Sequence, residues 1–271
     1  MNIEQIKECV NLMDQRRYDE AITFQKGIIA ANSADILSRV LLGNAHRENN
    51  QPKPAISEYE ESLRLYQEGG SMNTYMLSYS LLGRALCKVA IYESSMDEEL
   101  ECFLQEADNV VNLFMSEHFE YAQAPDDMYE KAIELSIKLG FYLGGLSMAE
   151  EKLKAALAFL KADTSRDLAY RERLAAYAYS LMAKHSIKDV DGNFILVDSS
   201  IQAIRKLRRY CSIAASYIDL VHGWNTPLGN DSVIVINFVM PWRVAHGTNE
   251  PVNIEAGGLN AEILEKGMFD L

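Results

Sequence analysis

Apolar residues recur along most of the chain at spacings of three and four positions, which is the periodicity of amphipathic helices. This pattern indicates ten helices separated by short polar segments. Pairs in which Ser or Asp precedes Glu or Gln by three positions begin at Ser95, Asp127 and Ser199, and such pairs are typical of helix starts. The predicted helices span residues 3–14, 19–31, 34–48, 52–67, 72–92, 96–117, 126–147, 149–161, 166–185 and 199–221.

The run 186–197 breaks the helical pattern. It places short β-rich stretches on both sides of Asp191-Gly192, and this dipeptide is a hairpin signal. A calcium loop built on Asp189, Asp191 and Asn193 is the alternative. Gly192 comes two places too early for such a loop, and no glutamate closes it. We therefore expect a β-hairpin inserted at 186–197.

The segment 222–271 differs in composition from the rest of the chain. It holds six of the 15 glycines, three of the six prolines and both tryptophans. Residues 233–240 are apolar and β-branched, which predicts a buried strand, and an unpaired strand of this kind needs a partner such as the hairpin. We expect a helical domain at 1–221, followed by a cap at 222–271 with one strand and a short helix near 260–266.

Small residues recur at a fixed interval in the first part of the chain. Ala21 and Ala55 lie 34 positions apart, and Gly43 stands on the helix before Ala55. Bulky Tyr18 and Tyr59 lie close to the two alanines in sequence. This pattern resembles the tetratricopeptide repeat, in which small residues on two antiparallel helices let the helices approach closely.

The resemblance is clearest over residues 8–65 and weaker over 72–161. A third unit begins at Leu82-Gly83, and a fourth rests on Gly144 and Ala156, which repeat the interval between Gly43 and Ala55. The resemblance implies an all-α superhelical solenoid of about five helix pairs with a small β-containing C-terminal cap. It also implies a protein–protein interaction module, adaptor or chaperone-like, that binds a protein or peptide on its concave face.

The same resemblance suggests four peptide-binding residues. Asn44 occupies a position that family members use to hold a ligand, and Arg47 follows about one turn later. Arg84 and Lys88 repeat this pair in the next unit. Arg and Asn can bind a carboxylate through directed hydrogen bonds. The alternative is that all four are ordinary solvated polar positions.

A second candidate pocket would be lined by His222, Trp224, Trp242 and His246, which lie on either side of the predicted strand. Such a pocket would favour an enzyme. No motif places a nucleophile near these residues, and no metal-ligand set is complete. Tryptophans in irregular segments also serve as core residues. We therefore expect no catalytic residue, no metal site and no cofactor.

The charge of the chain limits its partners. With 39 acidic and 26 basic residues, its net charge is −13, which disfavours nucleic-acid binding. An acidic inhibitor or immunity-type protein that masks a basic partner is therefore an alternative function. The densest basic run, 205–209, flanks an apolar stripe that begins at Ile201. It is expected to pair with the protein's own acids, although a patch for nucleic acid or an acidic partner is the other interpretation.

The four cysteines form no CxxC pair, and each falls in an apolar helical pattern. They are expected to be buried free thiols in a reducing compartment. The first ten residues do not resemble a signal peptide, and the longest apolar stretch is too short to span a bilayer. We expect a cytoplasmic protein without membrane contact, and homo-oligomers remain possible. The cysteines are Cys9, Cys87, Cys102 and Cys211.

Overall fold

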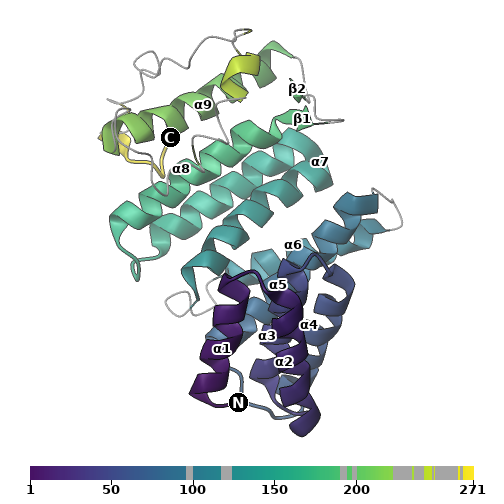
Figure 1. Ribbon diagram of the computed structural model, residues 1–271. Helices are drawn as coiled ribbons and strands as arrows, with labels where there is room; N and C mark the ends of the chain where they lie inside the picture. Colours follow the sequence, from purple (N-terminus) through teal and green to yellow (C-terminus); the bar gives the residue numbers. More distant parts are fainter. Residues whose placement is uncertain are drawn as a thin grey trace. The chain divides into compact units, whose positions relative to one another are not determined.

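The structure is a computed structural model that describes residues 1–95, 100–116, 124–189, 194–196, 200–221, 234, 241–245, 247, 262 and 265–271. Helices dominate these residues, as the sequence predicts (Figure 1). The chain divides into two compact units, Met1–Ala132 and Ile133–Leu271. Its elements are α1 (Ile3–Asp14), α2 (Tyr18–Ala31), α3 (Ile36–Glu48), α4 (Pro52–Gln67), α5 (Thr74–Ser95), α6 (Glu101–Phe114), α7 (Asp126–Ala162), α8 (Leu168–His185), β1 (Ile187–Asp189), β2 (Phe194–Leu196) and α9 (Ile201–Val221).

In the first unit, helices that follow one another in sequence also pack together. Contacts run from α1 to α2, α2 to α3, α3 to α4, α4 to α5 and α5 to α6. Contacts also join α3 to α5, which are two elements apart. The predicted helices 3–14 and 52–67 have the same bounds as α1 and α4. The polar cap of α1 is a reciprocal pair of hydrogen bonds between Asn2 and Gln5.

The core of this unit is organised around Tyr59, whose side chain is fully buried. A Cβ atom placed on Gly43 of α3 would lie 2.6 Å from Cε1 of the Tyr59 ring. A Cβ atom on Gly83 of α5 would lie 2.6 Å from Cζ of the same ring. The two glycines therefore leave the space that the Tyr59 ring fills between α3 and α5.

In the second unit, α7 is interrupted at Gly144 and Gly145, so that it consists of two helical arms. Gly145 has φ 64° and ψ −153°, a conformation that essentially only glycine adopts. Beyond this turn the chain folds back, because a Cβ on Gly140 would lie 2.6 Å from Cα of Ala149. The two helices predicted at 126–147 and 149–161 are present, but the turn lies at Gly144 and Gly145, so the prediction that Gly144 lies within the first of them is wrong.

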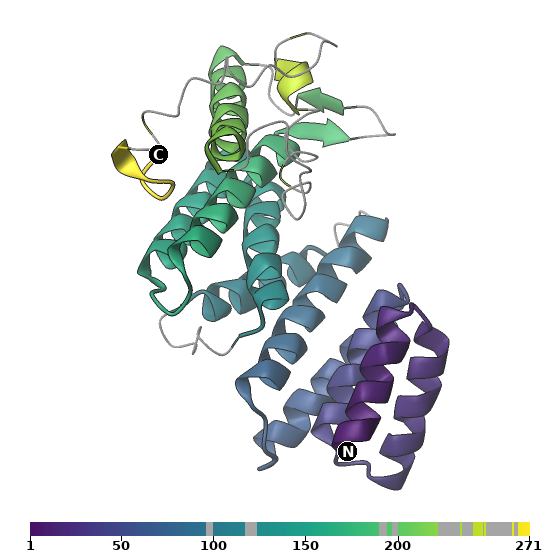
Figure 2. The same cartoon turned by 60° about the vertical axis from the view of Figure 1, so that its left-hand side comes forward.

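The predicted hairpin is present beside the end of α8 (Figure 2). Strands β1 and β2 are antiparallel, and Lys188 pairs with Ile195. Helix α9 packs against α8. Of the strand predicted at 233–240, only Ile234 is described, and it is helical and buried, so the strand prediction is wrong at this residue.

The described part of the C-terminal segment is also helical. Residues 241–245 form a short helix, and Glu262, Glu265 and Lys266 are helical where the sequence predicted the final helix. Gly267, with φ 74°, ends it. Within the described ranges, none of the helices combines the length and the apolar character needed to cross a membrane.

Two predictions about burial need correction. Ile201 was assigned to the apolar stripe of α9, but it is 71% exposed because it stands at the first position of the helix. Cys102 is exposed on α6, whereas the other three cysteines are buried. All four are free thiols, as predicted. Burial raises the pKa of the Cys87 thiol to about 11.

Candidate functional site

Two of the predicted peptide-binding residues are buried and engaged within the first unit. Asn44 is only 4% exposed, and its Oδ1 accepts a hydrogen bond of 2.7 Å from the hydroxyl of Tyr59. The Lys88 ammonium pairs with Glu106 and lies 5.1 Å from the centroid of the Phe103 ring. Both side chains therefore contribute to the packing of this unit.

The two predicted arginines are less enclosed. Arg47 pairs with Glu48 at 2.8 Å, and its Nη1 is buried without a hydrogen-bond partner. Arg84 is half-buried on α5, and it forms no ion pair with any residue that the structure describes. Since α3 and α5 pack together, the structure places all four predicted residues on neighbouring helices.

Most of the second predicted pocket lies outside the described residues, namely His222, Trp224 and His246. Trp242 is described, and it is a buried residue with 7% exposure in the helix 241–245. Nearby, the Arg208 guanidinium donates hydrogen bonds of 2.8 and 3.0 Å to the backbone oxygen of Ala245. These contacts fasten the helix 241–245 to α9.

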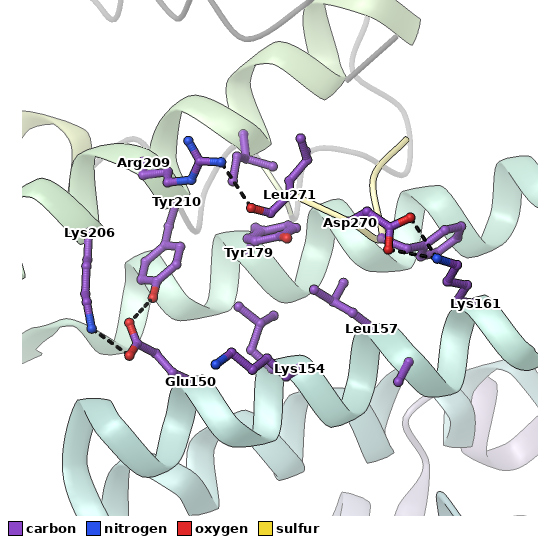
Figure 3. A pocket seen from close by; sticks show the side chains of 14 residues that line it. Glu150, Lys154, Leu157, Lys161, Tyr179, Lys206, Arg209, Tyr210, Asp270 and Leu271 are labelled. Atoms are coloured by element: carbon purple, nitrogen blue, oxygen red, sulfur yellow. Dashed lines mark hydrogen bonds and ion pairs between the residues drawn. The ribbon is translucent and has the colours of Figure 1, made fainter. Parts of the chain in front are cut away.

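A cavity of about 730 Å³ lies in the second unit, between the second arm of α7, α8, α9 and the last residues of the chain (Figure 3). Its wall combines apolar, aromatic and charged side chains. The apolar and aromatic residues are Leu153, Leu157, Ala158, Tyr179, Tyr210, Ile213, Phe269 and Leu271. The charged residues are Glu150, Lys154, Lys161, Lys206, Arg209 and Asp270.

One end of the cavity is held by a three-residue polar network. The hydroxyl of Tyr210 donates to Oε1 of Glu150 at 2.7 Å, and the ammonium of Lys206 donates to Oε2 at 2.6 Å. Burial acts to raise the pKa of Glu150, but the hydrogen bonds from Lys206 and Tyr210 outweigh it and lower this pKa. Burial, and next the hydrogen bond to the carboxylate, raise the pKa of Tyr210. Glu150 is thus a carboxylate whose two oxygens are already engaged.

The other end is covered by the segment Phe269–Leu271. The Asp270 carboxylate accepts two hydrogen bonds of 2.8 Å from Lys161. Arg209 donates to the backbone oxygen of Leu271 at 3.0 Å and pairs with Glu262 at 3.2 Å. As predicted, basic residues of the run 205–209 pair with acids of the same chain, since Lys206 and Arg209 both do so.

The cavity is basic in a protein that is acidic. Four cationic side chains line it, against the two carboxylates of Glu150 and Asp270. Lys154 is exposed on the same face of α7 as Glu150 and Leu157, and it forms no ion pair within the part of the chain that the structure describes (Figure 3). A cation beside apolar wall residues can hold an anionic group whose neighbours are apolar.

The titratable side chains of the lining are carboxylates, amines, a guanidinium and two phenols. The lining contains no Ser, Thr, Cys or His side chain. Tyr179, whose pKa burial raises to about 12, is neutral at physiological pH. In the described ranges, no group of three or more His, Cys, Asp or Glu side chains could hold a metal ion. The arrangement suits binding of a ligand.

Sequence reasoning missed this cavity. One signal was available on α7, where Glu150, Lys154, Leu157 and Lys161 follow the three- and four-residue spacing of one helix face. Such a face is typical of a solvent-exposed amphipathic surface until its neighbours are known. The opposite wall of the cavity is formed by α9. Its residue Lys206 lies 56 positions from Glu150 in the sequence, and only the fold brings the two side chains together.

The comparisons with known proteins add no relative to this picture. No protein-family model matches the chain, and no curated protein matches it either.

Proposed function

We propose that the chain is a non-catalytic binding module that holds an acidic, partly apolar segment of another protein in the cavity of its second unit. The observation that carries this proposal is the set of four cationic side chains around an apolar wall, in a chain of net charge −13. A general excess of charge would have made this cavity acidic. Three of the four cations, Lys161, Lys206 and Arg209, pair with carboxylates of the chain. Lys154 is the cation that remains to attract an anionic ligand.

The size and the lining of the cavity agree with this proposal. Sites that enclose small ligands have volumes of roughly 300–1,000 Å³, and this cavity, at about 730 Å³, can take one or two side chains of a bound segment. Leu153, Leu157 and Ile213 offer apolar contact, while Lys154 offers a charge that forms no ion pair in the described part of the chain. A ligand with a carboxylate next to an apolar side chain would satisfy both features.

The finer features of the predicted fold belong to the same proposal. In it, the first unit is a tetratricopeptide-like stack of helix pairs, and the C-terminal region caps the end of the helical domain. The packing of α3 on both α4 and α5, with Tyr59 between two glycines, supports the first of these statements. Stacks of this kind commonly bind other proteins.

A matched pair of charge reversals tests the proposal. The probe is a fluorescein-labelled hexapeptide with two aspartates beside one phenylalanine, titrated by fluorescence anisotropy. Lys154→Glu should weaken binding at least tenfold, whereas Arg84→Glu makes the same charge change on α5 and should leave binding unaltered. The reverse result would assign the ligand to the face of α3 and α5, and equal binding by both variants and the parent would refute a specific acidic site.

The net charge also supports a second function, that of an acidic protein that masks a basic partner. Binding of this kind would use the outer surface and would depend steeply on ionic strength. Surface plasmon resonance against a panel of basic proteins, at low and at physiological salt, separates the two functions. The masking function would be favoured if the affinity for a basic protein decreases as the salt concentration rises and is the same in the Lys154→Glu variant and the parent.

A further inference from the structure

The residues that cover the cavity resemble the ligand that the cavity would accept. Phe269, Asp270 and Leu271 present an aromatic ring, a carboxylate and an aliphatic side chain in direct succession. The Phe269 ring lies 5.9 Å from the guanidinium carbon of Arg171, the Asp270 carboxylate pairs with Lys161, and the Leu271 backbone oxygen accepts from Arg209. Each of the three residues thus contacts a cationic side chain of α7, α8 or α9.

We propose that Phe269–Leu271 is an internal ligand, and that the partner is an extended segment with the same succession of aromatic, acidic and aliphatic side chains, which displaces it. This inference rests on the proposed function, because it names the chemistry of the ligand for the same cavity. Binding of the partner would then be an exchange of one acidic segment for another.

The way in which this segment is attached makes exchange feasible. Met268 is 1% exposed and anchors its start, next to Gly267 in the left-handed conformation. Beyond Met268, Asp270 pairs with Lys161, and the two side chains are 52% and 56% exposed, respectively. Exposed ion pairs contribute little stability, so the segment can leave the cavity while Met268 stays in place.

Release of the segment changes the charge of the cavity. With Asp270 gone, Glu150 would be the remaining carboxylate of the lining, and Lys206 and Tyr210 already engage it. Arg209 would still pair with Glu262, which lies outside the lining. Lys161 would lose its only carboxylate partner within the described residues. An incoming acidic segment would restore both the charge balance and the aromatic contact with Arg171.

Because the internal segment is tethered to the chain, it competes for the cavity more effectively than a free peptide of the same sequence, and substitutions in the segment can remove this difference. A ligand on a short linker acts at an effective concentration on the order of millimolar. The apparent affinity of a free competitor is therefore its intrinsic affinity multiplied by the fraction of cavities that the tethered segment has left. The double variant Phe269→Ala/Asp270→Ala weakens the internal ligand but leaves the walls on α7, α8 and α9 unchanged. Glu265→Ala is the control, because Glu265 lies in the same terminal segment and outside the lining.

The probe is an acetylated and amidated fluorescent peptide that covers residues 267–271, added to the full chain and to both variants in an anisotropy titration. We expect the double variant to bind it at least tenfold more tightly than the parent chain, and Glu265→Ala to bind it as the parent does. Lys161→Glu in the double-variant background should abolish the gain. Circular dichroism checks that each variant keeps its helices.

Each other result has a definite meaning. Equal binding by the parent and the double variant would overturn the internal ligand while leaving the proposed binding function intact. Binding by neither, together with no binding of the aspartate–phenylalanine hexapeptide, would overturn both. A concentration-dependent dimer that disappears in Asp270→Ala, seen by sedimentation velocity, would assign the cavity to a second copy of the chain and would also overturn the inference.

Discussion

The hydroxyl of Tyr59 donates a hydrogen bond of 2.7 Å to the amide oxygen of Asn44, and both side chains are buried. This contact joins α4 to α3 at the level where α5 packs on the other side of the ring. Asn44 was predicted to hold a ligand. Its oxygen binds a neighbouring helix, and the ligand role of its amide stays a prediction. Any ligand role of Asn44 would require a second hydrogen bond or the loss of this one.

Replacement of Tyr59 by Phe should destabilise the protein. The change leaves the buried oxygen of Asn44 without its donor, at a cost of about 1–3 kcal/mol in the free energy of unfolding. Urea denaturation followed by circular dichroism measures this cost. Tyr66→Phe is the matched control, because the Tyr66 side chain is 41% exposed and its loss of a hydroxyl should change stability very little. Equal stability of the two variants would show that the Tyr59–Asn44 contact contributes nothing.

Single methyl groups on the two glycines that face Tyr59 should also be destabilising. In Gly43→Ala and Gly83→Ala, the new Cβ would lie 2.6 Å from the fully buried Tyr59 ring, so the ring or a helix must shift. Overpacking of this kind costs roughly 1–3 kcal/mol. Thermal unfolding of each variant should show a lower midpoint than the parent.

The same helical domain offers a control for these substitutions. Gly27 lies in α2, and a Cβ added there would meet no atom within 4 Å. Gly27→Ala should therefore stabilise the protein by about 0.5–1 kcal/mol, because alanine is the better helix former. A lower melting midpoint for Gly27→Ala would contradict the packing that the structure assigns to α2.

A pH dependence of stability should come from His185. Burial, followed by the charges of Lys184 and Lys138, lowers the pKa of His185 to about 3, and its Nε2 is buried without a partner. The unfolded chain takes up a proton at the ordinary histidine pKa of about 6.5 while the folded chain does not, so stability falls as the pH drops below that value. Between pH 7 and pH 5 the loss should be about 2 kcal/mol.

Urea titrations at pH 7 and pH 5 test this prediction in the parent chain and in His185→Phe. The phenylalanine fits beside Phe141, whose ring centroid lies 5.8 Å from that of His185, and it cannot titrate. The variant should lose less stability than the parent over this range. An identical loss in both proteins would assign the pH dependence to other groups.

The sequence predicted the elements far better than it predicted the site. Apolar periodicity located α1 and α4 to the residue, and Asp191-Gly192 located the hairpin, because these signals are local. The prediction that the chain is helical is confirmed. The break between the predicted helices 126–147 and 149–161 is present, but it lies at Gly144-Gly145, a few residues earlier than predicted, because a glycine in an apolar run also suits close helix packing, as Gly140 in fact does.

The candidate site depends on contacts that no local pattern contains. Asn44 and Lys88 occupy positions that look exposed on an isolated helix, and only their neighbours Tyr59 and Glu106 reveal that they are engaged. The cavity similarly depends on Lys161 meeting Asp270, which follows it by 109 positions. Charge and apolar content along one helix face can suggest a surface, but the partner helix decides whether that surface becomes a pocket.

Because the chain reverses at Gly144 and Gly145, the end-to-end length of α7 is much smaller than its number of helical residues suggests. As one uninterrupted helix, its 37 residues would form a rod about 55 Å long, at about 1.5 Å per residue. Lys154 and Lys161 would then be carried far from Arg209 and Tyr210, although hardly any residue would cease to be helical. A bulky residue at position 145 would thus remove a wall of the cavity without a visible change in the far-ultraviolet spectrum, and ligand binding would be the measurement that detects it.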